Sequence, residues 1–275
     1  MQKLYIPLLM ILSGTSNYLG AALAVNLFGI ENPWIVAWMR VGAAGIIIAL
    51  ALQPSLTQWL SWQALIYGVV TLGMNTSFYE VIQTIPLGMA VAIEFIGPIC
   101  VAAWGSRTVR DWIALCAAAT GVVVLSGTQW GANFTGILWI LASAFLWAMY
   151  ILVSNRLASS DSTFHTMGVG LTYASLLVIP LVAWRWEPIP ATGPSVWLLI
   201  AMAIGLGLLS AVIPFVLDLI MLKSASPDYY AVLLALLPVT AAVIGMIALG
   251  QIPSAVEVLG ILLIVIAVTL RKQTA

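Results

Sequence analysis

Residues 33–52 read PWIVAWMRVGAAGIIIALAL, an apolar run that contains a single charged side chain, Arg40. A helix needs about 20 apolar residues to cross the roughly 30 Å hydrocarbon core of a bilayer, and this run has that length. The rest of the chain is similar, because 63% of its 275 residues are hydrophobic and only 7% are charged. A soluble domain carries about a quarter charged residues. The sequence therefore predicts an all-α integral membrane protein.

Ten segments of the chain are apolar enough to be transmembrane helices. Short connectors that contain Pro, Gly, Asn or Ser separate them, and none is long enough to hold a soluble domain. Lys and Arg gather in cytoplasmic loops. If both termini are cytoplasmic, seven of the nine basic residues fall on the cytoplasmic side, while Arg185 lies outside and Arg40 lies within a helix. The expected spans lie near residues 4–25, 33–52, 62–82, 86–105, 111–127, 135–155, 164–184, 194–222, 228–250 and 253–270.

The two halves of the chain show the same pattern. In the first half an acidic residue, Glu80, ends a helix and the next helix carries Pro98; in the second, Asp218 precedes a helix that carries Pro238. About five spans separate the patterns, and an odd number of spans per repeat inverts the second copy in the membrane. Inverted repeats are typical of alternating-access transporters. We therefore expect one integrated membrane domain made of two inverted five-helix repeats, residues 1–130 and 131–275.

Two ionisable side chains lie well inside the expected spans. Such a group costs about 2.5–3.5 kcal/mol on insertion scales, so it normally has a partner or a task. Pro98 cannot donate to the carbonyl of Glu94, so this carboxylate and a free carbonyl could together bind an ammonium group or a proton. Glu94 could equally be a paired structural residue. Arg40 could bind a substrate carboxylate through both prongs of its guanidinium, pair with Glu94, or extend to the interface.

Further candidates are less sharply marked. Asp218 lies one turn after Pro214, toward the inner side, and is with Glu94 a candidate proton site. Glu80 ends a span at the interface, where a carboxylate costs little, so a structural role is the leading interpretation. Ser13 and Asn17 share a face of the first span with Gly20 and Ala24. Neutral polar and aromatic residues could line a cavity or serve only helix packing: Asn17, Asn75, Tyr79, Trp147 and Tyr150.

The stretch 85–98, IPLGMAVAIEFIGP, and the Leu-Gly-x-x-Pro turn at 249–253 resemble the drug/metabolite transporter superfamily. Within it, the whole chain is similar to the EamA-type proteins with ten helices, and the stretch 86–98 looks most like the bacterial threonine/homoserine exporter group. This resemblance implies a multi-pass protein of the bacterial inner membrane that exports amino acids. Two positions depart from the pattern: Gln251 stands where the family often has a glutamate, and Leu237 where the exporter group tends to have an acidic residue.

The function expected from these observations is a secondary transporter that exports small polar metabolites, most often amino acids, by alternating access around a midplane cavity. A proton is a candidate coupling ion. A passive channel or facilitator has the same architecture, and an intramembrane enzyme is the third alternative. The sequence contains no HExxH or GxSxG motif, so we expect no enzyme. One histidine and two cysteines in apolar runs, expected to be core residues, predict neither a metal nor a cofactor, and no basic patch indicates a nucleic-acid partner.

Overall fold

The computed structural model describes residues 2–104, 108–127, 134–157, 163–186, 194–224, 233–234 and 236–270, and every regular element that it defines there is helical. The first half contains α1 Gln2–Leu27, α2 Pro33–Leu52, α3 Leu56–Trp59, α4 Trp62–Ile82, α5 Leu87–Glu94, α6 Ile96–Trp104 and α7 Val109–Gly127. The second half contains α8 Phe134–Leu157, α9 Thr163–Leu177, α10 Ile179–Arg185, α11 Val196–Gly207, the π turn η1 Leu208–Val212, α12 Ile213–Ser224, α14 Leu236–Leu249 and α15 Ala255–Leu270.

Five helical stretches of the described chain are long and apolar enough to cross a membrane: 5–27, 33–52, 134–154, 164–184 and 196–218. Shorter apolar helices cover 87–101, 112–125, 236–249 and 255–267. Helix α4 has the length of a span but carries four buried polar residues: Thr71, Asn75, Thr76 and Ser77.

The helix bounds agree closely with the expected segments at 33–52 and 62–82, whereas other segments are interrupted. The segment expected at 86–105 divides at Phe95 into α5 and α6, and the segment at 164–184 divides at Val178 into α9 and α10. A proline follows each break, Pro98 and Pro180, and a proline removes one helical donor. The short α3 was not expected. Within the segment expected at 228–250, residues 228–232 lie outside the described part.

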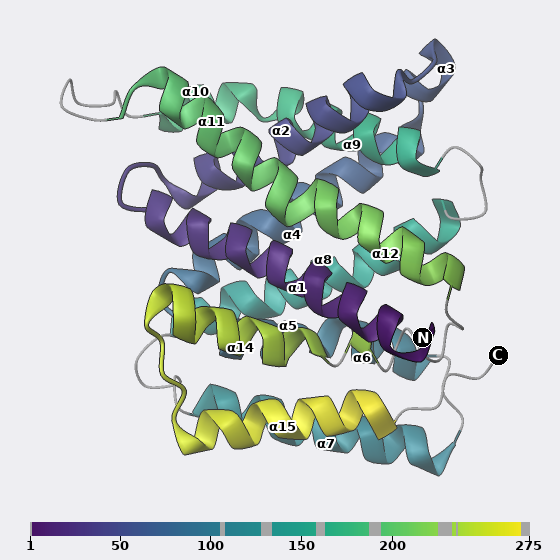
Figure 1. Ribbon diagram of the computed structural model, residues 1–275, viewed down its shortest axis with the longest axis vertical. Coiled ribbons are helices and arrows are strands. Elements are labelled where there is room, and N and C mark those ends of the chain that lie inside the picture. The colour runs from purple at the N-terminus through teal and green to yellow at the C-terminus, as the bar shows by residue number, and fades with distance from the viewer. Residues whose placement is uncertain are drawn as a thin grey trace.

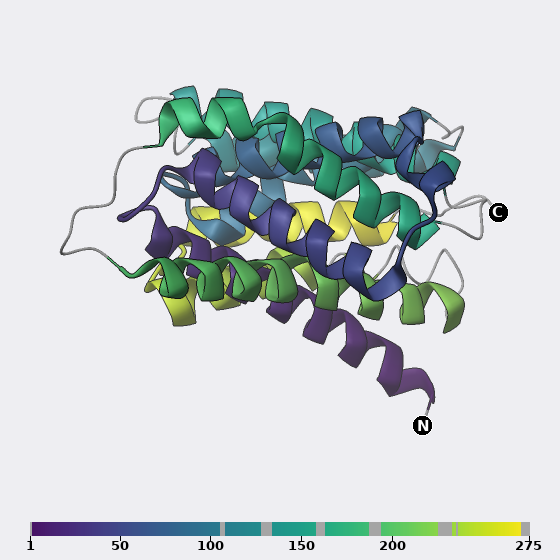
Figure 2. The ribbon, with the colours of Figure 1, turned by 90° about the horizontal axis from the view of Figure 1, so that it is seen from above.

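The long helices run side by side across the molecule, stacked along its longest axis (Figure 1). Helices α2 and α9 lie toward one end of the stack, α7 and α15 pair at the other, and α1, α5 and α14 lie between them. Helix α1 begins and α15 ends on the same side of the bundle (Figure 1). The view from above shows the N-terminal half of α1 leaning away from the other helices (Figure 2).

Glycines allow the central helices to approach closely. A Cβ on Gly68 of α4 would lie 1.8 Å from the carbonyl oxygen of Gly170 in α9, and one on Gly97 would lie 2.1 Å from the carbonyl oxygen of Ala144. Small residues at such crossings are typical of membrane helix packing, where backbones meet without intervening side chains.

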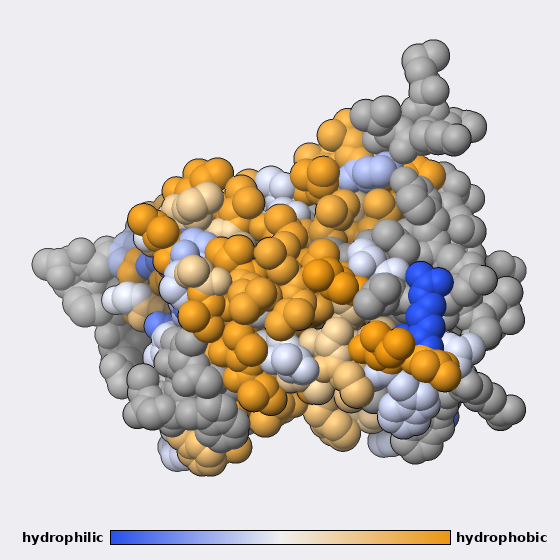
Figure 3. Space-filling model, turned by 90° about the horizontal axis from the view of Figure 1, so that it is seen from below, coloured by the Kyte–Doolittle hydropathy of each residue, from blue (hydrophilic) through white to orange (hydrophobic). Residues whose placement is uncertain are grey.

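Much of the exterior is apolar. On the face that carries α7 and α15, hydrophobic side chains form a broad surface (Figure 3). The large apolar side chains that these two helices expose include Ile113, Val123, Leu259 and Leu262. Both cysteines, Cys100 and Cys116, are free and exposed, so the expectation that they are core residues was wrong. A bilayer gives apolar side chains a second favourable environment besides the core, and the apolar character of a run cannot distinguish the two.

Candidate functional site

Arg40 of α2 is the centre of a polar cluster between α1, α2, α4 and the π turn. Its Nη2 donates to Asn17 Oδ1 at 3.1 Å and to the backbone carbonyl of Ser210 at 2.5 Å, and its Nη1 donates to the Tyr79 hydroxyl at 3.4 Å. The guanidinium carbon also lies 5.6 Å from the centre of the Tyr79 ring. All of these acceptors are neutral. Within the described part of the chain, Arg40 has no ion-pair partner.

Glu94, the last residue of α5, is 8% exposed. The hydroxyl of Ser143 in α8 lies 2.5 Å from its Oε1 and 3.2 Å from the Met74 carbonyl of α4, and it can donate to only one of them at a time. The ion pair between Glu94 and Arg40 that the sequence left open is not formed. The charge of Arg40 nevertheless lies close enough to act on Glu94. A carboxylate and a guanidinium therefore lie near one another without direct contact.

Asp218 of α12 is the third interior charge. Its Oδ1 accepts a hydrogen bond of 2.9 Å from Ser13 of α1. No other hydrogen bond or ion pair joins Asp218 to the described residues. Ser13 and Asn17 are four residues apart on α1, so they lie on one face of the helix, a turn apart. This face of α1 therefore bonds Asp218 through Ser13 and, one helical turn later, Arg40 through Asn17.

Tyr18 is a buried residue within electrostatic range of the three charges, and the sequence analysis did not single it out. The residue is 4% exposed, and Arg40, Glu94 and Asp218 are all near enough to act on its hydroxyl. No hydrogen bond joins that hydroxyl to another described residue. A tyrosine in an apolar helix carries no charge that would mark it, so its neighbours could not be deduced from the sequence.

The neutral candidates Asn75, Trp147 and Tyr150 contact other residues than the three interior charges. Asn75 donates to the carbonyl of Thr71 on its own helix at 2.8 Å. Trp147 packs edge-on against Phe95, with ring centres 4.9 Å apart, and Tyr150 packs against Tyr67 at 5.5 Å. Phe95 follows Glu94 in the chain, so the Phe95–Trp147 ring pair lies close to this carboxylate.

Glu80 is placed differently from the interior charges. Its carboxylate accepts a 3.0 Å hydrogen bond from Gln83 at the end of α4. The structure does not bring it to Arg40, Glu94 or Asp218 by any hydrogen bond or ion pair among the described residues. This position fits the structural interpretation that was favoured for Glu80.

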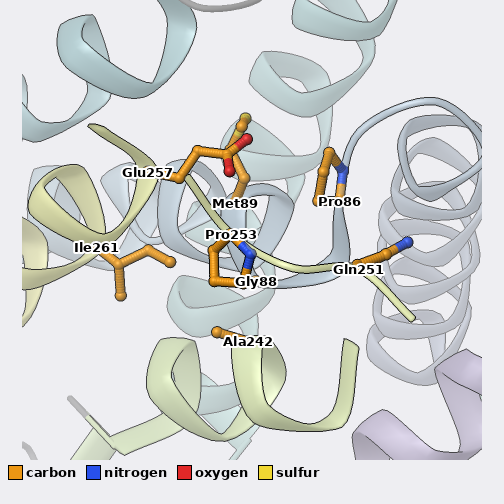
Figure 4. Close-up of a pocket in the computed structure, with 8 residues that line it drawn as sticks. All are labelled: Pro86, Gly88, Met89, Ala242, Gln251, Pro253, Glu257 and Ile261. Atoms are coloured by element: carbon orange, nitrogen blue, oxygen red, sulfur yellow. The ribbon is translucent and has the colours of Figure 1, made fainter. Parts of the chain in front are cut away.

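A separate pocket lies at the start of α5, where it meets the turn between α14 and α15 (Figure 4). Gln251 Oε1 accepts a 2.8 Å hydrogen bond from the backbone N–H of Leu87 and so caps α5. Glu257 accepts from the backbone N–H of Ser254 at 2.6 Å, which caps α15. The polar groups drawn in Figure 4 therefore stabilise helix ends, and none of the interior charges lines this pocket. Among the described residues no group of three His, Cys, Asp or Glu side chains could hold a metal ion.

Comparison with known proteins defines the class. The model of the EamA-like transporter family matches residues 134–271. A relative named threonine/homoserine exporter RhtA, from Salmonella typhimurium strain LT2, is 30% identical over 288 residues, which cover 98% of this chain and 94% of that protein. The chain therefore belongs to the EamA-like transporter family, is a multi-pass membrane protein and is not an enzyme, which confirms the resemblance drawn from the sequence.

Other relatives extend the comparison. The Escherichia coli K12 protein named threonine/homoserine exporter RhtA is 29% identical over 289 residues, covering 98% of this chain and 94% of its own length. A Vibrio cholerae protein named riboflavin transporter is 26% identical over 201 residues, covering 67% of this chain and 64% of its own. A solved crystal structure matches the fold with a TM-score of 0.60 at 20% identity, over 97% of this chain and 94% of that one.

Proposed function

We propose that this protein is a secondary transporter of the bacterial inner membrane that exports small zwitterionic metabolites, α-amino acids foremost, by alternating access around Arg40, Glu94 and Asp218. The names of the full-length relatives at 29–30% identity support amino acids as the substrate class. In this proposal Arg40 binds the substrate carboxylate, Glu94 or Asp218 binds its ammonium group, and the remaining carboxylate is the candidate site for a coupling proton.

One observation carries this proposal: the three interior charges are solvated by neutral groups and do not pair with one another. Arg40 contacts Asn17, Tyr79 and a carbonyl, Glu94 contacts Ser143, and Asp218 contacts Ser13. Unpaired charges inside a membrane protein are costly and are characteristic of substrate and ion pathways. An α-amino acid carries a carboxylate and an ammonium group on one small molecule. Its binding would therefore neutralise a positive and a negative side chain that the protein leaves unpaired.

The proposal includes two inverted repeats of five spans with both termini in the cytoplasm, and the packing of the helices supports the repeat. Counted along the chain, the first span, α1, packs on α12 of the eighth and α14 of the ninth. The sixth span, α8, packs on α4 of the third and α6 of the fourth. These pairs interchange when each span is replaced by the one five places along, as a repeat requires. The two broken spans that carry Glu94 and Asp218 also fit the discontinuous helices of such transporters.

Counterflow tests the proposal. Purified protein in liposomes preloaded with unlabelled L-threonine is expected to accumulate labelled external L-threonine transiently, with saturable kinetics. Accumulation by exchange requires a carrier, because a channel lets both pools run down their gradients. An imposed proton gradient that changes the steady level would identify the proton as coupling ion.

The result separates the alternatives. Linear, non-saturating uptake would support a channel instead. Absence of uptake for every α-amino acid, with the protein shown to be folded by its thermal unfolding transition, would contradict the proposed substrate class. Liposomes that contain Arg40→Gln protein are the matched control, because that variant lacks the proposed carboxylate ligand and is expected to show background uptake.

A further inference from the structure

The eighth span departs from α-helical geometry at η1, and the departure frees two backbone carbonyls. The N–H of Ile213 donates to Leu208, five residues back, instead of to Leu209. Residue 214 is a proline, which has no N–H to donate to Ser210. The carbonyls of Leu209 and Ser210 therefore lack the donors that an α-helix would give them. Such π turns are frequent at functional sites.

Neighbouring helices supply the missing donors. Ser16 of α1 donates to the Leu209 carbonyl at 2.6 Å, and Arg40 of α2 donates to the Ser210 carbonyl at 2.5 Å. Helix α1 can approach because residue 20 is a glycine: a Cβ there would lie 2.6 Å from Ser210 Cβ. The π turn thus joins the eighth span to both the first and the second, and one of the two links uses the guanidinium that faces the interior charges.

The hydrogen bond from Arg40 to the Ser210 carbonyl is weaker than the interaction that Arg40 can make with a carboxylate. The Ser210 carbonyl is a neutral acceptor and takes one bond from the guanidinium. A carboxylate carries the opposite charge and can accept two parallel bonds from the same guanidinium. A substrate carboxylate that reaches Arg40 therefore has reason to replace Ser210, and the reverse exchange occurs when the substrate leaves. Pro214 has no N–H with which to replace Arg40 at this carbonyl.

We infer that the Ser210 carbonyl positions Arg40 in the substrate-free protein, and that the substrate carboxylate displaces it, so that binding releases the eighth span from the second. This rests on the proposed function and assigns the site a coupling element: the π turn and Pro214. Arg40 is the ligand-binding residue, and Ser210 and Pro214 act through it. The link to α1 through Ser16 remains, so the release is local to α2.

Pro214→Ala tests the inference, because it returns an N–H that can bond Ser210 within the helix. The Ser210 carbonyl then keeps a donor when Arg40 leaves it, so the KM for L-threonine is expected to fall by about tenfold, the range of one hydrogen bond to a charged group. The maximal exchange rate is also expected to fall, because substrate binding then has less effect on the contact between the eighth span and α2. Inhibition by L-threoninamide, which lacks the carboxylate, is expected to change little. Pro180→Ala, at the exposed start of α10, is the matched control.

A double-mutant cycle makes the test specific to Arg40. Arg40→Lys keeps the charge but loses the fork that holds Ser210 and Asn17 together. If the inference holds, Pro214→Ala lowers the KM only in the wild-type background, and it raises the unfolding temperature more in the Arg40→Lys background, where the guanidinium no longer bonds the Ser210 carbonyl. Additive effects of the two substitutions, or a KM for L-threonine unchanged by Pro214→Ala, would overturn it.

Failure of the proposed function is distinguishable from failure of this inference. If the wild-type protein exchanges no α-amino acid, the proposed substrate class is contradicted. The cycle on the unfolding temperature does not depend on transport, and independent effects of Pro214 and Arg40 there overturn the inference by themselves.

Discussion

The bond between Glu94 and Ser143 shows how a buried carboxylate can be stabilised and still remain available to a ligand. Ser143 is fully buried on α8 and its hydroxyl lies 2.5 Å from Oε1 of Glu94. A hydroxyl contributes a hydrogen bond but no charge, so it lowers the cost of burial without neutralising the group. The negative charge is left for a substrate ammonium group or a proton.

Glu94→Gln is expected to abolish transport or uncouple it from a proton gradient while leaving the protein folded. The glutamine side chain has the same shape, and its carbonyl oxygen can accept the Ser143 hydrogen bond. It has no negative charge and does not titrate. Counterflow and gradient-driven transport of L-threonine measure the two losses, and the thermal unfolding transition reports the fold.

Glu257→Gln is the control for this substitution, since Glu257 caps α15 and lies among the residues of the separate pocket. Its transport rate should match the wild type. Wild-type transport rates and an intact gradient response in Glu94→Gln would remove Glu94 from the site.

A proline in a helix leaves the carbonyl four residues before it without its helical donor. This rule identified Glu94 from the sequence and could also have identified Ser210. Pro98 indicates a free carbonyl at Glu94, and Pro214 indicates one at Ser210 by the same spacing of four residues. Only the first lies at a charged residue, which is why it was noticed. That Arg40 is the donor to Ser210 depends on how α2 packs against η1, and no local pattern specifies that contact.

At the scale of elements, helix ends follow from local chemistry and helix partners do not. Asn32 accepts from the N–H of Trp34 and Pro33 starts α2, so this boundary was predicted. Gly250 has φ of 67°, the left-handed conformation that ends α14 where the Leu-Gly turn was recognised. The function of Gln251 as a cap for α5 was not predicted, since it joins residues 164 positions apart in the chain.

The crossing of α4 and α9 is the most demanding contact between elements. Gly68→Ala is expected to destabilise the protein by about 3 kcal/mol or more, because the new methyl group would lie 1.8 Å from a backbone oxygen that cannot rotate away. The unfolding midpoint in detergent measures the loss. Gly205→Ala is the matched control: its Cβ would meet only Leu23, at 3.8 Å, so the better helix propensity should raise stability by up to about 1 kcal/mol. Equal midpoints for the two variants would contradict the packing.

At the scale of the whole molecule, the proposed ten-span topology predicts that the two ends of the chain lie on the same side of the membrane. Helix α1 begins and α15 ends on one side of the bundle (Figure 1). The basic residues expected on that side are Lys3, Arg107, Arg110, Arg156, Lys223, Arg271 and Lys272. Since Lys and Arg are retained in the cytoplasm during insertion, that side is expected to be cytoplasmic.

Protease-cleavable tags at the two ends measure this directly. Both tags should be protected in sealed spheroplasts and both should be cleaved in inverted membrane vesicles, with a cytoplasmic protein as the marker that the spheroplasts are sealed. Cleavage of only one tag in spheroplasts would give an odd number of spans and exclude two inverted five-span repeats. Cleavage of both would keep the even number but reverse the orientation. The half of the site that contains Asp218 would then face the periplasm, and the direction of export assigned to the Arg40, Glu94 and Asp218 cluster would have to be reversed.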